Sequence, residues 1–465
     1  MEKSLSQDFS DLSKRKSKGL FIFRRDLRTV DNTTFSQMRN LCETIYPIFI
    51  FTPEQIGSQN EYKSDICVQF MIESLIDLDK QLNGKLCTLY GDNNTVIRHC
   101  ISEWDIDLVG FNIDISPYAK KRDQDIIDLC KTANVSVLGY HDYYLHQPGT
   151  IVNGSGETYQ KFTPYYETAQ RIKIHPPEKS FSFRNLKKGS LAKYQISLKD
   201  SFRFCKKAES MENTLKGGRL EGLKQLNEAK QIAKHYSTTH DELAKPTTQL
   251  SAYIKFGCIS IREVKHALGS NHALIRQLHW RDFYASILNT FPRVLGHALK
   301  PRYDEIKWKN NSNWFEKWCS GKTGYPIVDA GMTELNTTGF MHNRARLIVA
   351  SFLVKTLQID WRKGEKYFAQ HLIDYDPASN NGNWQWIAGS GADSQPYFRI
   401  FNPWEQAKHH DPDCEYIKKW LPFLEKVPKE DILNWNVEHE KYKDVYCAPI
   451  VDYFEQKEKV LKMYT

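Results

Sequence analysis

The side chains best suited to chemistry are concentrated in one segment of the chain, residues 361–403. In order they are Asp374, Asp376, Asn380, Asn381, Trp384 and Trp386, with glycine and serine around them and few aliphatic residues. Flat aromatic walls with a few placed polar groups suit a planar ring ligand or a nucleic-acid base. The segment therefore predicts a binding site, and the rest of the chain must position it.

Size and composition set broad limits on what the chain can be. Its 465 residues are enough for two or more domains, each with its own core. Hydrophobic residues make up 40% and charged residues 26%, as in globular proteins that fold in water. The formal net charge of +8 favours a polyanionic partner, although 64 basic against 56 acidic residues is mild evidence.

Cysteine usage and the absence of apolar runs indicate the compartment. The ten cysteines are scattered singly with no CxxC, which indicates reduced thiols inside a cell. No apolar run approaches the roughly 20 residues of a membrane span, and the polar start lacks the apolar core of a secretion signal. We expect an intracellular protein (cytoplasm, nucleoid or nucleus) that is not secreted, makes no membrane contact and has a disordered basic tail at 1–17.

Short apolar runs alternate with amphipathic stretches in the first third of the chain. The runs are Gly19–Phe23, Ile45–Phe51, Lys85–Tyr90, Leu108–Asn112 and Ser136–Tyr140. Between them, stretches such as Ser64–Asn83 place apolar residues near helical spacing. This alternation predicts an α/β domain with a doubly wound parallel sheet over residues 18–146. No GxGxxG follows the first run, so a nicotinamide site there is not expected.

The remaining chain is expected to form a linker and a helical domain. Residues 147–215 are turn-rich and without periodicity, which predicts an interdomain linker. A connector this long that wraps round the domains needs anchors, which Phe162, Tyr165 and Tyr166 could supply. Residues 216–465 show helical spacing and predict an all-α domain that holds the ligand pocket.

Two arginines inside an apolar stretch need partners. Phe340–Leu357 is apolar nearly all round, which predicts a buried helix. Arg344 and Arg346 lie within it, and burying either charge unpaired would be unfavourable. The acids Asp374 and Asp376 are the expected partners.

Two short motifs do not support a phosphate or metal site. Gly321–Thr323 resembles the end of a P-loop, but Glu316 stands where the first glycine is needed. His409 and His410 are adjacent, and adjacent histidines rarely converge on one ion, so a solvated loop is expected. We predict no metal centre.

Five stretches together resemble the DNA photolyase/cryptochrome family. In chain order they are RRDLRTVDN (Arg24–Asn32), TTQLSAYIKFGCIS (Thr247–Ser260), HWRDFYASIL (His279–Leu288), Gly321–Lys355 and Trp361–Pro403. The resemblance covers residues 19–425. HNR at 342–344 and SNNGNWQW at 379–386 are most similar to class I cyclobutane pyrimidine dimer photolyases. The family resemblance implies an antenna role for the α/β domain. It also implies an FAD, held in a U shape, in the helical domain.

The resemblance assigns residues to the flavin. Thr247, Thr248, Leu250 and Ser251 match the loop that binds its phosphates, with Gln249 between them where arginine is common. Tyr236 matches a tyrosine at the pocket edge, Arg346 and Asp374 a salt bridge against the ring, and Asp376 an acid near the ring and ribitol. Asn380 matches the residue that faces the reactive ring nitrogen, where plant cryptochromes tend to carry Asp. Asn380 therefore favours repair over signalling.

It also assigns an electron path and a DNA surface. Trp384, Trp361 and Trp308 match the chain of three tryptophans that carries an electron from the surface to the excited flavin. On the substrate side the matching residues are His240, Gln277, Trp280, Arg281, Asn343, Arg344, Leu347, Trp386 and Gln406. The implied reaction is light-driven splitting of a flipped-out cyclobutane dimer by a carbon–carbon lyase. UV-damaged DNA would be bound without regard to sequence, by a monomer.

Some positions depart from the family pattern and leave alternatives open. Gln277 stands where class I enzymes usually carry Glu, Leu347 where they carry Met, and Phe340 where they carry Trp. Ala119 stands where folate-binding members carry a Glu, so a second, antenna chromophore could be a deazaflavin, a folate or another flavin, or there could be none. The alternatives are a photolyase with another lesion or strand preference, such as (6-4) photoproducts or single strands, and a cryptochrome-like blue-light photoreceptor.

Overall fold

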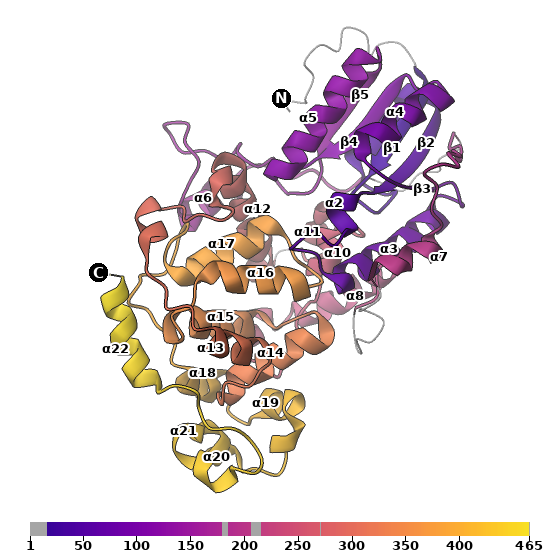
Figure 1. Cartoon of the computed structure of the whole chain (residues 1–465). Coiled ribbons are helices and arrows are strands. Elements are labelled where there is room, and N and C mark those ends of the chain that lie inside the picture. Colours follow the sequence, from indigo (N-terminus) through magenta and orange to yellow (C-terminus); the bar gives the residue numbers. More distant parts are fainter. Residues whose placement is uncertain (1–15, 179–184, 206–214, 270, 465) are drawn as a thin grey trace.

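The computed structural model describes residues 16–178, 185–205, 215–269 and 271–464, in an α/β part and a larger helical part (Figure 1). The α/β part holds a parallel sheet in the order β3-β2-β1-β4-β5. The strands are β1 Lys16–Phe23, β2 Cys42–Phe51, β3 Cys87–Tyr90, β4 Leu108–Ile113 and β5 Ser136–His141. The predicted parallel α/β fold is therefore confirmed.

Both faces of the sheet are buried, as a doubly wound fold requires. On β1, Phe21 and Phe23 point into one core, and Leu20 and Ile22 point into the other. A register shift of one residue would exchange these two sets of side chains, so the pattern fixes the register. The covering helices are α1 Thr33–Leu41, α2 Pro53–Ile56, α3 Asp65–Gln81, α4 Asn93–Trp104 and α5 Pro117–Thr132.

One edge of the sheet faces the helical domain. The strand order reverses between β1 and β4, and in α/β folds ligands bind where the loops leave the carboxyl ends of such strands. The loop after β1 carries the charged motif Arg24–Arg28, and within it Leu27 N donates to Phe256 O across the domains (3.0 Å). Arg28 is ion-paired with Asp142, which follows β5. This edge is therefore an interdomain contact.

The linker is anchored on both domains. Its helix α6 (Phe162–Ala169) packs on helix α12 (His272–Thr290) through Phe162 and Tyr165, which are buried, and Tyr166, which is half-buried. Residue Ile45 of β2 makes a bridge with Leu186 on the return path, before the short helix α7 (Leu198–Ser201). These three aromatic residues hold the segment against the helical domain.

The helical domain surrounds a second large apolar core. Its helices are α8 Arg219–Ile232, α9 Tyr236–Thr239, α10 Ser251–Lys255, α11 Ile261–Ala267, α12, α13 Ser312–Cys319, α14 Pro326–Thr338, α15 Asn343–Ser351, α16 Trp361–His371, α17 Pro377–Ala388, α18 Pro403–His410, α19 Glu415–Trp420, α20 Lys429–Leu433, α21 Trp435–Glu438 and α22 Tyr453–Met463. Short 3₁₀ turns lie at Pro292–Val294, Pro301–Glu305, Pro422–Leu424 and His439–Tyr442.

The expected helix at Phe340–Leu357 is present but begins later. It starts at Asn343, because the side chain of His342 accepts a hydrogen bond from Arg344 N and so caps the helix. It continues as a π-helical turn over Phe352–Thr356. Its apolar side chains lie in the core of the helical domain, as predicted.

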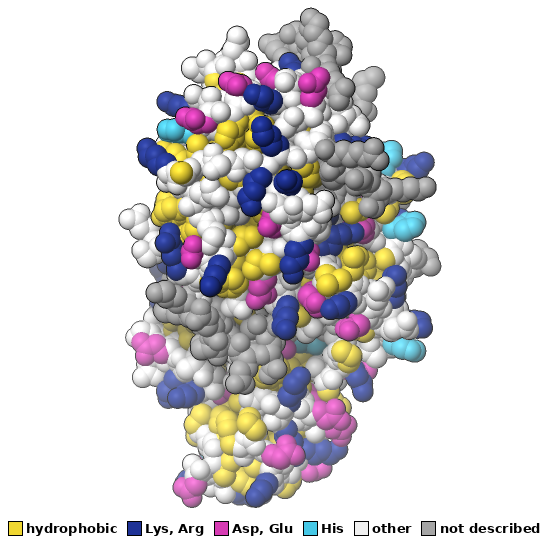
Figure 2. All heavy atoms as spheres, turned by 90° about the vertical axis from the view of Figure 1, so that its right-hand side faces the viewer, with side chains coloured by type: hydrophobic (Ala, Val, Ile, Leu, Met, Phe, Trp, Pro, Cys, Tyr) yellow, Lys and Arg dark blue, Asp and Glu magenta, His cyan; other side chains and the backbone are white. Residues whose placement is uncertain are grey.

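The ends and the surface give further limits. Strand β1 already includes Lys16 and Ser17, and the rest of the expected tail lies outside the described residues. Within the described ranges no helix is long and apolar enough to cross a bilayer. On the face in Figure 2, Lys and Arg side chains are interspersed with Asp and Glu over the whole length of the molecule. This mixture agrees with the modest net charge of +8.

Candidate active site

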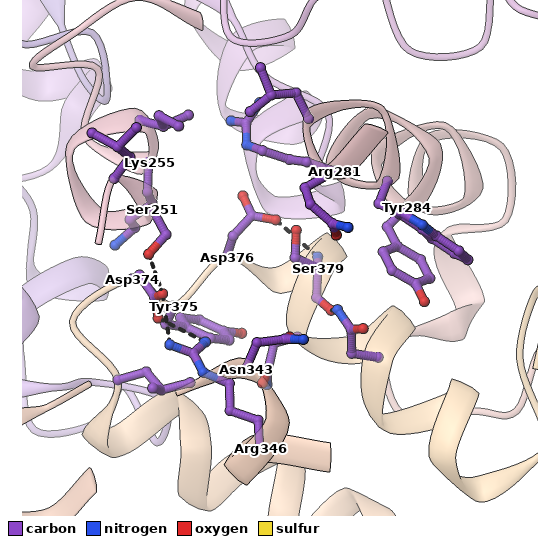
Figure 3. Close-up of a pocket in the computed structure, with 18 of the residues that line it drawn as sticks. Ser251, Lys255, Arg281, Tyr284, Asn343, Arg346, Asp374, Tyr375, Asp376 and Ser379 are labelled. Atoms are coloured by element: carbon purple, nitrogen blue, oxygen red, sulfur yellow. Dashed lines mark hydrogen bonds and ion pairs between the residues drawn. The ribbon is translucent and has the colours of Figure 1, made fainter. Parts of the chain in front are cut away.

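A cavity of about 490 Å³ lies among α10, α12, α15 and α17 of the helical domain (Figure 3). Most of its wall is apolar, with leucines from α12 and α15 and aromatic rings from α16 and α17. Polar side chains also face the space, among them Asn343, Asp374, Asp376 and Asn380. This size and lining are typical of a site for a cofactor or other small molecule.

One polar group in the wall is a bidentate ion pair. Arg346 Nη1 and Nη2 lie 3.2 and 2.9 Å from the two carboxylate oxygens of Asp374. Ser251 Oγ also donates to Asp374 (2.6 Å), and Arg346 Nε donates to Met341 O (2.8 Å). Two parallel N–H···O bonds fix the guanidinium plane. The predicted pairing of Arg346 with Asp374 is confirmed.

The same prediction was wrong for Arg344. Its guanidinium pairs with Asp241, with Nε 3.2 Å from Oδ1. Two residues along an α-helix are separated by about 200° of rotation, so Arg344 and Arg346 point to opposite sides of α15. Asp376 instead meets Arg25 of the α/β domain (3.1 Å).

Asn380 is oriented by a neighbour on α16. Its Nδ2 donates to Glu365 O (3.0 Å) and Glu365 Oε1 (3.2 Å). Because both acceptors belong to Glu365, the amide nitrogen points to α16 and Oδ1 is the atom offered to a ligand. Burial raises the pKa of the Glu365 carboxyl to about 7, while hydrogen bonds from Asn380 and Tyr62 lower it. Sequence reasoning missed Glu365, since a single Glu in an amphipathic helix carries no motif.

Trp384 forms part of the cavity wall and is 2% exposed. Its ring meets Phe368 edge-on, with centroids 4.9 Å apart. The backbone of Gly364 lies so close that a Cβ there would be 2.2 Å from the indole. Helix α16, which begins at Trp361, is therefore packed directly on Trp384.

Trp361 and Trp308 lie farther from the cavity. Trp361 is 1% exposed, whereas Trp308 is half-buried. The residue after Trp308 is bonded to the segment leading into α16, with Lys309 N donating to Gln358 O (3.0 Å). Neither indole Nε1 has a hydrogen-bond partner in the described chain. The three tryptophans thus lie on successive, contacting segments from the cavity wall outward.

Aromatic rings form the outer part of the cavity. Trp280 stacks on Phe162 with ring centroids 3.7 Å apart and planes 6° apart. Trp280 and Trp386 both line the space and are half-buried, and Tyr284 lies beside Trp280 (5.5 Å between centroids). Phe162 comes from the linker, so the linker supports one wall of the site.

The structure brings together most, but not all, of the residues singled out in the sequence. Lining the cavity are Tyr236, Thr248, Leu250, Ser251, Arg346, Asp374, Asp376, Asn380, Gln277, Trp280, Arg281, Asn343, Leu347, Trp384 and Trp386. Not among its lining residues are Thr247, Gln249, His240, Arg344, Gln406, Trp361 and Trp308. Lining residues that the sequence did not single out include Lys255, Tyr284, Tyr375, Ser379 and Asn383.

Neither Gly321–Thr323 nor the pair His409 and His410 forms a ligand site in the structure. The Gly321–Thr323 turn folds round a carboxylate, with Thr323 N and Gly324 N both donating to Asp329 (2.9 and 3.0 Å). His409 and His410 end helix α18 instead of lying in the expected loop, and their rings are 6.4 Å apart. Within the described ranges, no group of three or more His, Cys, Asp or Glu could hold a metal ion.

Comparison with known proteins decides the family. Residues 20–180 match the family model described as DNA photolyase, and residues 274–465 match that of the FAD binding domain of DNA photolyase. The chain belongs to the DNA photolyase family. Relatives named deoxyribodipyrimidine photo-lyase come from Halobacterium salinarum (31% identity over 96% of this chain and 98% of the relative) and Escherichia coli (32%, 95% and 97%).

Solved structures of the family superimpose over nearly the whole chain. An archaeal photolyase from Sulfolobus tokodaii with two FAD molecules gives a TM-score of 0.85 at 37% identity, over 96% of this chain and 99% of that one. A class III photolyase from Agrobacterium tumefaciens gives 0.88 at 30%, over 99% of both chains. A Synechocystis cryptochrome gives 0.85 at 26%, over 97% and 100%. Because repair enzymes and a cryptochrome share this shape, function must be argued from the site.

Proposed function

We propose that the protein is a deoxyribodipyrimidine photo-lyase that splits cyclobutane pyrimidine dimers in UV-damaged DNA. The observation that carries the proposal is the cavity wall, where the amide oxygen of Asn380 is left free for a ligand near the Arg346–Asp374 pair and Trp384. This set of polar groups, together with an oxidisable indole in the same wall, supports a flavin site.

The residues present fit FAD. The apolar wall suits an isoalloxazine ring, and the fixed Arg346 guanidinium can donate to it. Asn380 Oδ1, as an acceptor, favours a flavin whose ring nitrogen carries hydrogen, which is the form a reduced flavin takes. The chemistry supplied by bound, reduced FAD is light-driven transfer of one electron to the dimer, with its return after the cyclobutane ring opens.

The chain's own tryptophans would reduce the flavin and keep water away from the path of the electron. Trp384, Trp361 and Trp308 would pass an electron inward, because indole is easily oxidised and their segments are in contact. Burial of Trp384 and Trp361, at 2% and 1% exposed, excludes water from the inner steps.

Lesion recognition falls to the outer cavity. A dimer flipped out of the duplex would stack against Trp280 and Trp386, and a damaged, poorly stacked pair is cheaper to extrude. Gln277 and Asn343 are exposed at the lining and can hydrogen-bond the base edges. Basic residues such as Arg344 would contact phosphates, so binding is independent of sequence, and one monomer contains the whole site.

We infer that a second chromophore, where present, is a flavin rather than a folate. Ala119 offers no carboxyl to a pterin and is 2% exposed at the start of α5. The Sulfolobus tokodaii relative, at 37% identity, carries two FAD molecules. Chromatography of the chromophores released from purified protein, with two FAD per chain expected and folate contradicting the inference, tests this.

The proposed function is tested by repair. Purified, reduced protein is illuminated with blue light in the presence of an oligonucleotide carrying one cyclobutane dimer, with a (6-4) oligonucleotide and dark samples in parallel. Loss of the cyclobutane lesion only in the light is the expected result. Repair of the (6-4) lesion alone would mean that Gln277 and Leu347 specify the pocket more strongly than Asn343. Light-driven flavin reduction without repair of either lesion would identify a photoreceptor.

A further inference from the structure

Arg25 reaches from the α/β domain to Asp376, a carboxylate that lines the proposed flavin cavity. It belongs to the charged motif in the loop after β1, and its Nη1 lies 3.1 Å from Asp376 Oδ2 and 3.7 Å from Asp114 Oδ2. Its guanidinium lies over the ring of Tyr143 (4.8 Å to the centroid) and near Tyr144 (5.8 Å). The side chain is 15% exposed, so two rings and two carboxylates hold it in one position.

The carboxylate that Arg25 meets has two further roles. Asp376 lines the cavity and also caps α17, since its Oδ1 accepts a hydrogen bond from Ser379 N (3.0 Å) (Figure 3). Helix α17 carries Asn380 in its first turn and Trp384 in its second. A change in the charge or position of Asp376 would therefore affect Asn380 beside the proposed cofactor and Trp384 at the start of the electron path.

Burial and Arg25 act on Asp376 in opposite directions. Desolvation raises the pKa of the Asp376 carboxyl, and the charge of Arg25, followed by that of Arg281, lowers it, with a net shift below its ordinary value. The charged and titratable groups that act on this carboxyl are Arg25, Arg281, Lys255, Tyr144 and Tyr375, and Asp114 and Tyr143 face Arg25 on its other sides. A buried carboxylate that loses its nearest cation is left uncompensated, which is strongly unfavourable.

We propose that Arg25 is a positioning residue for the flavin, which neutralises and fixes Asp376 and so sets the midpoint potential of the cofactor from the other domain. The inference rests on the proposed placement of FAD in this cavity. An unbalanced carboxylate in the wall would oppose the electron added on reduction. Loss of Arg25 should therefore lower the potential while Asp376 is charged. Without Arg25, desolvation raises the pKa of the Asp376 carboxyl, so at lower pH the carboxyl becomes neutral and the potential should return toward that of the wild type.

The test compares three arginine variants of the flavin-loaded full chain. Arg25→Gln removes the charge, and Arg25→Lys keeps the charge without the planar fork. Arg262→Gln is the matched control, because Arg262 joins the domains through Asp31 and Asp142 (2.9 and 2.7 Å) without touching Asp376. Dye-coupled redox titration between about pH 5 and 8 measures the midpoint potential, and equilibrium dialysis measures FAD affinity.

The expected result is a fall of about tenfold in the equilibrium constant for flavin reduction at pH 8 in Arg25→Gln, the factor of one pKa unit of interaction. At pH 5 the fall should be smaller. Arg25→Lys should recover most of the loss, and Arg262→Gln should match the wild type. Asp376→Asn should abolish the effect of Arg25→Gln, since the two residues form one interaction.

Equal shifts in Arg25→Gln and Arg262→Gln would overturn the proposal, because they would indicate general loosening of the domains. An unchanged potential in Arg25→Gln, or an effect that persists in the Asp376→Asn background, would also overturn it. If Arg25→Gln does not retain FAD, Arg25→Lys decides: a midpoint potential close to that of the wild type at pH 5 and pH 8 supports the proposal, and a fall of about tenfold in the equilibrium constant for flavin reduction that persists at both pH values contradicts it. A wild type that binds no FAD would instead refute the proposed function.

Discussion

The polar side chains of the cavity wall each depend on a partner from a distant part of the chain. Asp374 is held by Arg346 and Ser251, and Asn380 by Glu365. Buried charges and amides are stable only when paired in this way. The partners therefore decide what the wall presents to a ligand as much as the wall residues themselves.

Asn380→Asp should alter the flavin far more than DNA binding. The new carboxyl would lie where Nδ2 now donates to Glu365 Oε1 (3.2 Å), so two carboxyls would share one proton beside the cofactor. We expect about a tenfold fall in the reduction equilibrium, measured by redox titration, with DNA affinity unchanged. Asn383→Asp is the matched control, since Asn383 lines the same cavity but is exposed and bonds to Ser379 O (2.8 Å). Equal effects of the two variants would contradict the role of Asn380.

Glu365→Gln should remove a pH dependence of stability. Burial raises the pKa of Glu365 from 4.5 to about 7. Between these values the folded protein binds more protons than the unfolded chain, so the free energy of unfolding falls as pH rises through that window. Gln at this position cannot titrate. The difference in free energy of unfolding between variant and wild type should therefore shift by about 3 kcal/mol in favour of the variant when the pH is raised from 4.5 to 8. Urea unfolding at both pH values measures this, and the exposed Glu405→Gln should show no such gain.

Sequence reasoning reached the wall residues but not their partners. Asn380, Trp384 and Arg346 stand in motifs that resemble a known family, which placed them without any structure. Arg25 and Asp376 are 351 residues apart, and no local pattern indicates that they meet. Glu365 was missed for the same reason, because its role depends on which face of α17 packs against α16.

At the scale of elements, periodicity was informative where burial is two-sided. The strands read as continuous apolar runs, and all five lie within one to three residues of the ranges expected from the sequence. The prediction that failed concerned the direction in which a side chain points from its helix. Arg344 and Arg346 stand in one buried helix, yet the rotation between them sends Arg344 to Asp241. Spacing along the sequence gives the element, while the rotation of the helix in its packed position selects the partner.

Gly364→Ala should disturb the packing of α16 on α17. The added Cβ would lie 2.2 Å from the Trp384 ring and 2.5 Å from Leu353, too close for either group to remain in place. Overpacking of this kind costs about 1–3 kcal/mol, and displacement of Trp384 should also slow photoreduction of the flavin. Thermal unfolding and flash photolysis measure the two effects. Gly154→Ala has no heavy atom within 4 Å of the new Cβ and should change neither.

At the scale of the whole molecule, the two domains and the linker form one site. The linker supplies Phe162 behind Trp280, the α/β domain supplies Arg25 to Asp376, and the helical domain supplies the cavity. The α/β and helical regions were predictable as separate units from their different periodicities. Their mutual contacts were not, because the charged motif after β1 reads equally well as a solvated loop.

The charge distribution of the molecule predicts how salt affects recognition of DNA. The net charge is only +8, with 64 basic against 56 acidic residues, so phosphate contacts should be few and the slope of affinity against salt shallow. Selectivity for a dimer should come instead from the aromatic wall at Trp280, whose stacking is insensitive to salt. Raising salt from about 50 to 200 mM should therefore weaken binding to damaged and intact duplexes by the same factor.

Variants of Arg344 and Trp280 should separate the phosphate contacts from the stacking wall. Arg344→Ala leaves Asp241 without its cation near the cavity, so it should weaken binding to damaged and intact duplexes equally and reduce the salt slope. Trp280→Ala removes a stacking wall and should lower the preference for the damaged duplex without changing the slope. Fluorescence anisotropy measures the affinity for each of the two duplexes at each of the two salt concentrations. The preference for damage and the salt slope follow from these affinities. A preference that collapses in high salt would mean that charge, rather than the cavity, selects the lesion, and the assignment of Trp280 as its wall would have to be abandoned.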